Sequence, residues 1–210
     1  CEGSAWQFTW YVPHDVKSLI NLIGERQFID RLNAGFATSE KVSFNALGDN
    51  MGAYPINHGN ETNMQAAYLF SYTSEPWHTQ KWARAIQEKY YGMGPRDAYP
   101  GDEDQGQMSS WYILSSIGLF QMDGGCSKDP VWLLGSPRFD RVEILLDNTY
   151  YSGKKLIIKA ENVSKDNCYI QYVRFNNKRL SNNYIEWSKL KKGGTLHFIM
   201  GDRPNPNAFK

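Results

Sequence analysis

Cysteine is scarce in this sequence, and long apolar segments are absent from it. The 210 residues include three cysteines, Cys1, Cys126 and Cys168. Three are too few for a disulfide framework, they show no metal-ligand spacing, and at most one pair could bridge. No stretch approaches the ~20 consecutive apolar residues that a transmembrane helix requires. We therefore expect neither a disulfide-held scaffold nor a membrane span.

A strong charge of one sign is also missing. The formal net charge is +1, so the sequence predicts no bulk attraction to nucleic acid or to a membrane surface. The charge is uneven, however, because residues 1–120 hold 8 Lys and Arg against 13 Asp and Glu, while residues 121–210 hold 15 against 9. The acidic first part suits a cation site, whereas a mildly basic second part is more often only a solvated surface.

Aromatic residues are abundant by contrast. They make up 14% of the chain, with 7 Trp and 13 Tyr. Flat, rigid aromatic faces suit the apolar C–H face of a sugar ring. The alternative is a core rich in tryptophan, and composition alone favours that alternative.

The first ~120 residues have the periodicity of helices. Val16, Leu19, Ile20 and Ile23 are spaced i, i+3, i+4, i+7, and Gly24 ends this amphipathic stripe. Further helices are predicted from a second stripe around 28–32 that stops before residue 35, and at 63–72, at 76–91 after a proline, and at 106–117.

From about residue 121 the pattern changes to short β-prone runs separated by Asn, Gly and Asp. These runs are 131–134, 142–146, 155–160, 169–175 and 195–200. They predict an antiparallel sheet or sandwich. The expected fold class is therefore α+β, with a helical domain at 1–122 and a β-rich domain at 123–210.

The segment from Gly101 to Gly106 is the most informative one for chemistry. Asp102, Glu103 and Asp104 are successive carboxylates, which repel one another unless a cation, water or substrate uses them. Asp102 and Asp104 can point the same way in a loop, for shared metal ligation or for activation of a water. The alternative is an exposed acidic turn that caps the following helix.

A second polar cluster spans residues 57–63, Asn-His-Gly-Asn-Glu-Thr-Asn. Such a density of amide, carboxylate and backbone oxygens, with no thiolate nearby, suits a hard cation such as Ca²⁺. The alternative is a polar loop in which Asn60 or Thr62 caps the next helix.

A third cluster places Glu2 among the aromatic residues Trp6, Trp10 and Tyr11. Desolvation there would raise the pKa of the Glu2 carboxyl and allow it to donate a proton near neutral pH. The alternative is an aromatic core helix with Glu2 at its frayed end.

The adjacent pair His14 and Asp15 has the residue types of a catalytic dyad. No motif with a nucleophilic Ser or Cys accompanies it. A structural hydrogen bond is therefore the favoured interpretation.

Four motifs in order resemble one family, the bacterial calcium-dependent α-mannosidases of glycoside hydrolase family 92. They are Glu-Gly-Ser-Ala-Trp-Gln at 2–7, Val-Pro-His-Asp at 12–15, His-Gly-Asn-Glu at 58–61, and Gly-Asp-Glu-Asp-Gln-Gly-Gln-Met-Ser-Ser-Trp-Tyr at 101–112. The resemblance covers most of residues 1–120 by motif and the remainder more loosely.

The resemblance implies an inverting exo-α-mannosidase whose catalytic domain is an (α/α)6 barrel joined to β-rich structure. By motif position Glu2 would be the general acid, Asp104 the general base and Asp102 an assisting carboxylate. The calcium ligands would include Asn60, Glu61 and Asp102, and the substrate pocket or its support would include Trp6, Gln7, His14, Asp15, Asn57 and His58.

Three departures from the family pattern stand out, and the third bears on linkage specificity. Thr62, Asn63 and Met64 stand where the family usually has Pro-Ser and then His, and Gln105 replaces a common Asn. Residues 57–58 are Asn-His where members specific for α-1,2 linkages have His-Glu, so the resemblance leaves the linkage open.

Family members are much longer, so this chain would supply only about half a barrel. It begins without Met and without a visible signal peptide, and we expect a processed or truncated product. The missing N-terminal portion, or another chain, would complete the barrel, and residues 1–210 alone would be inactive. Family habit implies secretion or the periplasm of a bacterium.

Two other functions remain open at this stage. One is a non-catalytic carbohydrate-binding module in which aromatic residues stack on sugars and the carboxylates only hold Ca²⁺. The other is an inverting (α/α)6 glycosidase that acts on a different sugar.

Overall fold

The chain forms two compact units. A computed structural model describes residues 3–46, 48–101, 103 and 106–210, and these fall into unit 1, Cys1–Ile113, and unit 2, Leu114–Lys210. The sequence suggested a division at 122/123, whereas the structure divides inside the last predicted helix. The end of that helix belongs to unit 2 because the Ser116 carbonyl accepts a hydrogen bond from Arg138 N at 2.8 Å.

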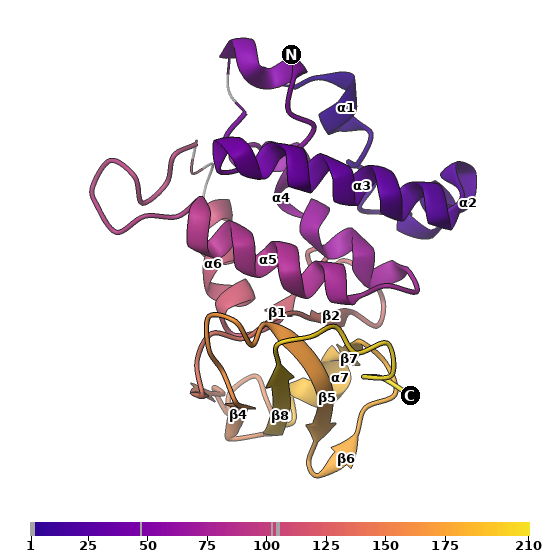
Figure 1. Cartoon of the computed structure of the whole chain (residues 1–210). Coiled ribbons are helices and arrows are strands. Elements are labelled where there is room, and N and C mark those ends of the chain that lie inside the picture. The colour runs from indigo at the N-terminus through magenta and orange to yellow at the C-terminus, as the bar shows by residue number, and fades with distance from the viewer. Residues whose placement is uncertain (1–2, 47, 102, 104–105) are drawn as a thin grey trace. The chain divides into compact units, whose positions relative to one another are not determined.

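Unit 1 is helical, with short 3₁₀ segments between its longer helices (Figure 1). Its elements are α1 (Ala5–Phe8), α2 (Val16–Ile23), α3 (Glu25–Ser39), η1 (Glu40–Val42), η2 (Gly48–Gly52), α4 (Glu61–Met64), η3 (Ala66–Tyr72), α5 (Trp77–Lys89) and α6 (Gln107–Ser116). The predicted helices at 16–23, 76–91 and 106–117 are confirmed. Asp15 caps α2 and Pro76 lies at the N-cap of α5, as helix-start chemistry favours.

Two helix predictions are wrong in detail. Helix α3 continues through Gly35 to Ser39, because the buried stacking of Phe36 on Trp82 outweighs the low helix propensity of glycine. A Cβ built on Gly35 would lie 3.3 Å from Pro55 Cβ. The segment 63–72 is not one α-helix but the end of α4 followed by the 3₁₀ helix η3.

The core of unit 1 is aromatic, as the tryptophan-rich alternative predicted. Helices α3 and α5 lie side by side in Figure 1, and Phe36 of α3 stacks on Trp82 of α5 at 5.3 Å between ring centroids. Trp10 meets Phe28 edge to face at 5.5 Å. Trp10, Trp82 and Trp111 are each 2% exposed or less, so these rings stabilise the fold by burial.

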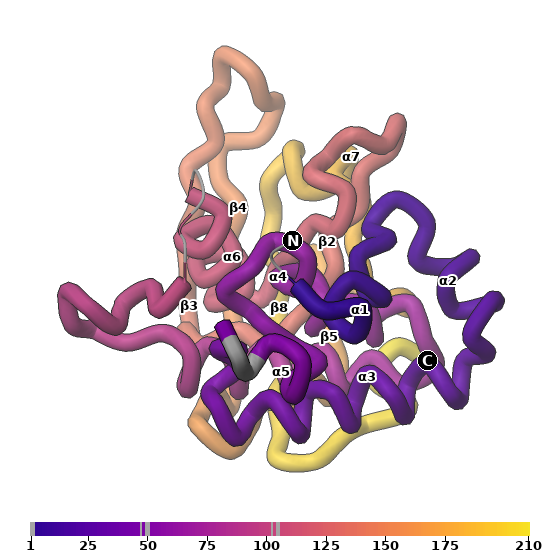
Figure 2. The backbone as a smooth tube through the Cα atoms, turned by 90° about the horizontal axis from the view of Figure 1, so that it is seen from above, coloured from indigo at the N-terminus to yellow at the C-terminus, as the bar shows by residue number. Residues whose placement is uncertain are grey.

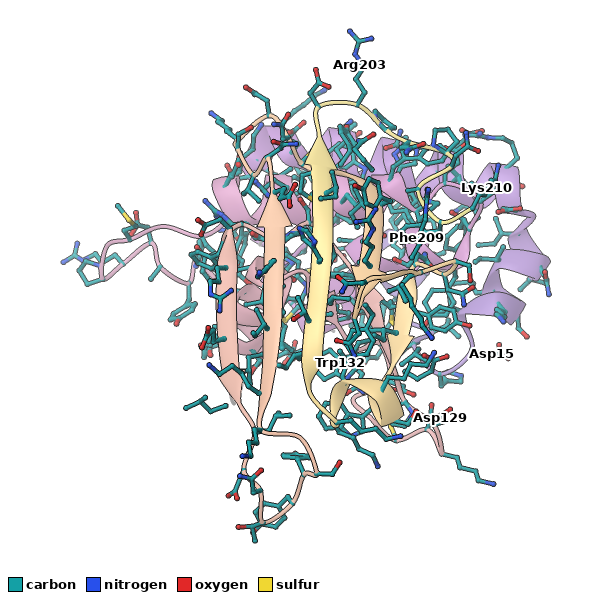
Figure 3. The ribbon with its side chains drawn as sticks, turned by 90° about the horizontal axis from the view of Figure 1, so that it is seen from below. Asp15, Asp129, Trp132, Arg203, Phe209 and Lys210 are labelled. Carbon is teal, nitrogen blue, oxygen red and sulfur yellow. The ribbon has the colours of Figure 1, made fainter. Side chains whose placement is uncertain are left out.

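Unit 2 contains two sheets that share one hydrophobic core. Its elements are β1 (Leu119–Phe120), β2 (Val131–Leu134), β3 (Arg141–Leu145), β4 (Lys155–Glu161), β5 (Tyr169–Phe175), β6 (Lys178–Arg179), β7 (Tyr184–Glu186), α7 (Trp187–Leu190) and β8 (Gly194–Gly201). The strand orders are β1-β2-β7 and β3-β4-β8-β5-β6. Figure 3 looks onto the larger sheet. Buried residues of both sheets, such as Leu134 and Ile158, pack in the same cluster.

The five predicted strands are confirmed within one residue at each end, but the larger sheet is not wholly antiparallel. Strand β8 inserts between β4 and β5 and runs parallel to β4. Strands β1, β6 and β7 were missed, because two or three residues are too short to show a period-2 pattern.

The described part of the chain bears on two expectations from the sequence, the lack of a membrane span and the lack of a disulfide framework. Within it, no helix combines the length and apolar character needed to cross a bilayer. Cys126 is an exposed free thiol.

Candidate functional site

Gln7, the last residue of the first motif, is fully buried and joins the start of the chain to two distant segments. Its side-chain Nε2 donates to the carbonyl oxygens of Met51 at 3.2 Å and Tyr54 at 3.0 Å. Its Oε1 accepts from Ser4 N at 3.1 Å, which completes a capping box at the start of α1. These bonds fix helix α1, which begins three positions after Glu2 in the sequence.

Asn63 connects the first motif to the polar loop at 57–63. Its Nδ2 donates to the Gln7 carbonyl oxygen at 2.8 Å, and its Oδ1 accepts from Asn57 N at 2.8 Å. Asn63 and Asn57 are each 1% exposed. Because buried polar atoms are costly without partners, these bonds define the position of the loop. Figure 2 shows the result, with α1 beside α4.

A strained turn supports the other side of the same loop. Ser43 and Phe44 have φ values of 53° and 60°, a left-handed conformation that is unusual for a bulky residue. The Phe44 carbonyl accepts from His58 N at 2.8 Å, and Ala46 N donates to Asn57 Oδ1 at 3.2 Å. The strained turn thus presents backbone groups that hold residues 57–58.

His58 lies inside an aromatic enclosure. Its ring is 4.3 Å from the Trp111 ring and 4.9 Å from the Tyr90 ring, measured between centroids. His58 Nε2 and the Tyr91 hydroxyl are 2.8 Å apart. Burial lowers the pKa of His58 to about 3, so the ring is neutral at physiological pH. Burial also raises the pKa of the Tyr91 hydroxyl.

The third point of contact joins the polar loop to the acidic loop. A Cβ built on Gly101 would lie 2.7 Å from Gly59 Cα, from the Gly59 carbonyl oxygen and from the Tyr90 hydroxyl. A Cβ built on Gly59 would in turn lie 3.2 Å from Gly101 Cα. Only glycines fit this close approach. The backbones that precede Asn60 and residue 102 are therefore packed together.

Glu103 faces the start of α6. Its two carboxylate oxygens each lie 3.3 Å from Ser109 N, and it also accepts from the Ser109 hydroxyl. The Glu103 carbonyl accepts from Gln107 N at 3.2 Å. The capping alternative is therefore correct for the middle carboxylate of the acidic run, as the helix dipole favours.

The three residues expected to carry out the reaction, Glu2, Asp102 and Asp104, lie outside the described residues. Residues close to them in sequence are described, and the contacts above join the segments that hold these residues through the polar loop at 57–63. The segment that begins at Gly3 meets the polar loop through Gln7 and Asn63, and the polar loop meets Gly101.

The predicted substrate residues fall into two groups. Trp6 is 55% exposed, with the Arg31 guanidinium 5.7 Å from its ring centroid, and His14 is exposed as well. Asp15 accepts from Ser18 N at 3.1 Å and caps α2. Hydrogen bonds from the Ser18 side chain and from the Ser18 backbone lower the pKa of the Asp15 carboxyl. Asp15 thus makes a structural hydrogen bond, which is the kind of role that the sequence favoured for it.

Gln7, Asn57 and His58 form the second group, and all three are buried. Their observed contacts are with other parts of unit 1, and they position the loops. Contact of these three side chains with sugar stays a prediction. Of the aromatic residues expected to surround Glu2, Tyr11 is 46% exposed, whereas Trp10 belongs to the core.

Sequence reasoning missed Tyr90, Tyr91 and the bridging role of Asn63. The two tyrosines follow α5 and line a hollow of about 230 Å³ together with Asp97 and Pro100. No local pattern marks them, because their contacts are with residues more than 15 positions away. Asn63 was noted only as one of several amides in a polar loop.

The chemistry of the polar loop fits a hard cation. Asn60 and Glu61 are both partly exposed at the start of α4 and offer amide, carboxylate and backbone oxygens. Within the described ranges, no three His, Cys, Asp or Glu residues are grouped to hold a metal ion. Asp102, the third expected ligand, falls in the gap between those ranges.

The chain is similar to several known proteins. Two solved structures from Bacteroides thetaiotaomicron match the whole fold. One, titled a family GH92 alpha-mannosidase, is 34% identical with a TM-score of 0.83 over 99% of this chain and 26% of its own. The other, titled a Family GH92 Inverting Mannosidase, is 33% identical with a TM-score of 0.82 over 100% of this chain and 29% of its own.

A protein of Arthroderma benhamiae, named an uncharacterized secreted glycosidase, is 29% identical over 203 residues, which are 95% of this chain and 23% of that protein. The chain thus spans about a quarter of the length of these relatives. Fold and motifs together define part of a glycoside hydrolase. The family described as "Glycosyl hydrolase family 92 catalytic domain" matches residues 1–202, and the chain belongs to glycoside hydrolase family 92.

Proposed function

We propose that this chain is the part of an inverting, calcium-dependent exo-α-mannosidase that carries both reacting carboxyl groups. In the complete protein, unit 1 would form part of an (α/α)6 barrel. The substrate would be the terminal α-mannoside of a glycan. Glu2 would act as general acid, Asp104 as general base and Asp102 as the assisting carboxylate.

The observation that carries the proposal is the convergence of three motif segments in unit 1. Gln7 and Asn63 are joined at 2.8 Å, and Gly101 packs on Gly59 with no room for a methyl group. The polar loop that contains Asn60 and Glu61 therefore contacts both the start of the chain and the acidic loop, although these segments are up to a hundred positions apart in sequence. An acid, a cation site and a base drawn from these segments could thus share one cleft.

This arrangement suits a single-displacement reaction. The acid protonates the oxygen of the leaving group while the base removes a proton from a water that attacks the opposite face of the sugar ring. Inverting enzymes keep the two carboxyl groups roughly 6.5–9.5 Å apart to accommodate that water. Asn60, Glu61 and Asp102 would hold Ca²⁺, which supplies a positive centre for mannose hydroxyls. Trp6 offers an exposed ring for stacking on the sugar.

The test compares two neighbouring carboxylates in the complete enzyme that contains this chain. We expect Asp104→Asn to lower kcat on an α-mannoside by about 10²–10⁴-fold, because it removes the base. Glu103→Gln is the matched control, since Glu103 caps α6. The control should lower thermal stability while leaving kcat within a few-fold of the wild type.

Equal loss of kcat in the two variants, or no loss in Asp104→Asn, would contradict the assignment. Turnover by residues 1–210 alone that a calcium chelator does not affect would contradict both the fragment and the metal assignments. The carbohydrate-binding alternative expects no hydrolysis by the intact protein and unchanged sugar binding in both variants.

We also propose that the complete protein is secreted or periplasmic. This proposal rests on the family and on the secreted glycosidase of Arthroderma benhamiae that the chain resembles.

A further inference from the structure

Five basic side chains form a straight row across the larger sheet of unit 2. The registers pair Arg141 with Lys159, Lys159 with His197, His197 with Arg174, and Arg174 with Arg179. The row therefore crosses all five strands in the order β3-β4-β8-β5-β6. Directly opposed residues on neighbouring strands point to the same face of a sheet. Figure 3 shows these strands side by side.

The row lies on the face turned away from the hydrophobic core. Arg141, Lys159, Arg174 and Arg179 are exposed, and His197 is half-buried. The residues before and after them along the strands, such as Ile158 and Phe198, are buried in the core. Neighbouring strands are about 4.8 Å apart, so four gaps give a row of about 19 Å. Like charges directly opposite each other are destabilising, so this alignment opposes the stability of the sheet.

Acidic residues neutralise only the β3 end and the middle of the row. Glu143 pairs with Arg141 and, at 2.6 Å, with Lys155. Glu161 lies 2.9 Å from His197 Nε2. Among residues 114–210, which the structure describes throughout, none forms an ion pair with the three remaining cations, Lys159, Arg174 and Arg179.

The two arginines are held in place without being neutralised. Their guanidinium carbons lie 5.1 Å (Arg174) and 5.4 Å (Arg179) from the centroid of the Tyr172 ring. Arg179 also donates to the Asn207 carbonyl oxygen at 3.1 Å. Cation–π contacts and bonds to neutral carbonyls restrict the side chains but leave their positive charge available. The arginines are thus pre-organised to bind an anion.

We propose that this basic row is a binding surface for an acidic glycan, a polysaccharide that carries carboxylate or phosphate groups along its chain. A linear polyanion complements a row of about 19 Å better than a single small anion does, because it meets several cations at once. Membership of a glycoside hydrolase family favours a glycan over other polyanions. The surface belongs to unit 2 and uses none of the residues proposed for hydrolysis.

The experiment measures binding of residues 1–210 to three polysaccharides by affinity electrophoresis and calorimetry. Neutral mannan, phosphorylated mannan and polygalacturonate separate the sugar backbone from the two kinds of charge. We expect both acidic polymers to bind and neutral mannan not to bind through this surface. Binding should weaken as salt is raised, since the cations are exposed.

Two double variants of equal net charge test the location. Lys159→Gln with Arg174→Gln should weaken binding about tenfold, because two central cations are lost. Lys128→Gln with Lys191→Gln removes two exposed lysines outside the row and should change binding by less than about twofold. Circular dichroism and melting temperatures show whether each variant is folded.

Three outcomes would overturn the proposal. The first is equal binding by the two double variants when both are folded. The second is equal affinity for neutral and acidic polymers. The third is tighter binding to anionic lipid vesicles or to duplex DNA than to either acidic polysaccharide, since the row would then serve a membrane or a nucleic acid.

Discussion

Different interactions stabilise the interior of each of the two units. Unit 1 positions irregular segments with buried side-chain amides, as Gln7 and Asn63 do by bonding to distant backbone groups. Unit 2 relies on β-ladders around an apolar cluster that includes Ile158 and Phe198. The polar connections of unit 1 join segments that neighbour the proposed catalytic residues, whereas one face of the larger sheet of unit 2 carries a row of basic side chains.

This difference predicts where substitutions are costly. A buried amide that bonds to two backbone groups cannot be replaced without leaving both groups unpaired. A surface amide can exchange its partner for water. The predictions that follow test this contrast, from the largest expected effect to the smallest.

Asn63→Ala should destabilise unit 1 by about 2–4 kcal/mol, because Asn57 N–H and the Gln7 carbonyl would lose their buried partner. Asn167→Ala in unit 2 is the matched change, since Asn167 Nδ2 donates to the Asn162 carbonyl at 2.8 Å but at the surface. That variant should change stability by less than about 0.5 kcal/mol. Hydrogen exchange of peptides from each unit measures both. Similar losses in the two variants would contradict the contrast.

Acid should weaken unit 1 through His58. Its pKa is about 3 in the folded chain against 6.5 in a model peptide, so between these values the unfolded state binds the proton and the folded state does not. Stability from the neutral ring is complete above pH 6.5 and falls as the pH drops towards 3, by about 2 kcal/mol between pH 6.5 and 4.5.

Replacement by a side chain that does not titrate isolates this effect. His58→Gln should remove about 2 kcal/mol of the acid dependence in amides of residues 54–65, while those of unit 2 keep theirs. The measurement is hydrogen exchange at several pH values. If the acid dependence were unchanged in the variant, His58 would bind its proton equally well in the folded and the unfolded chain, which would contradict the prediction.

Gly101→Ala should cost about 1–3 kcal/mol, because the new methyl group would overlap Gly59 and the Tyr90 hydroxyl. Gly52→Ala is the control within unit 1, since a Cβ there meets nothing within 4 Å. Thermal melts compare the two variants. In the complete enzyme, calcium affinity measured by calorimetry should fall for Gly101→Ala alone. An equal fall for both variants would show that the contact between Gly59 and Gly101 has no specific effect on the metal site.

Secondary structure could be predicted where periodicity is strong. Helix α2 follows from four apolar residues that end at Gly24, and strands β2 and β5 from runs of β-branched and aromatic residues. The continuation of α3 through Gly35 could not be predicted, because it depends on the packing of Phe36 against Trp82, which is distant in sequence. The parallel pairing of β8 with β4 depends likewise on strand order, which no local pattern encodes.

The sequence pointed to the segments of the candidate site, but it did not reveal the side chains that hold these segments together. Oxygen-bearing residues at 57–63 and 101–104 were identified from density and spacing. The amide of Asn63, the ring of Tyr91 and the hydroxyl of Tyr90 escaped attention, because each acts through residues distant in sequence. The basic row of unit 2 could not be predicted from the sequence either, since its members come from five separate strands.

By itself, the sequence determined most of the local elements and the family, because these depend on neighbouring residues and on motif order. Only the tertiary structure decided that Gln7 and Asn63 join two segments, that Gly59 and Gly101 bring a third against the polar loop, and that five basic side chains align across one sheet. The physical reason is that such contacts depend on packing and register between distant segments, and their energies exist only once the chain has folded.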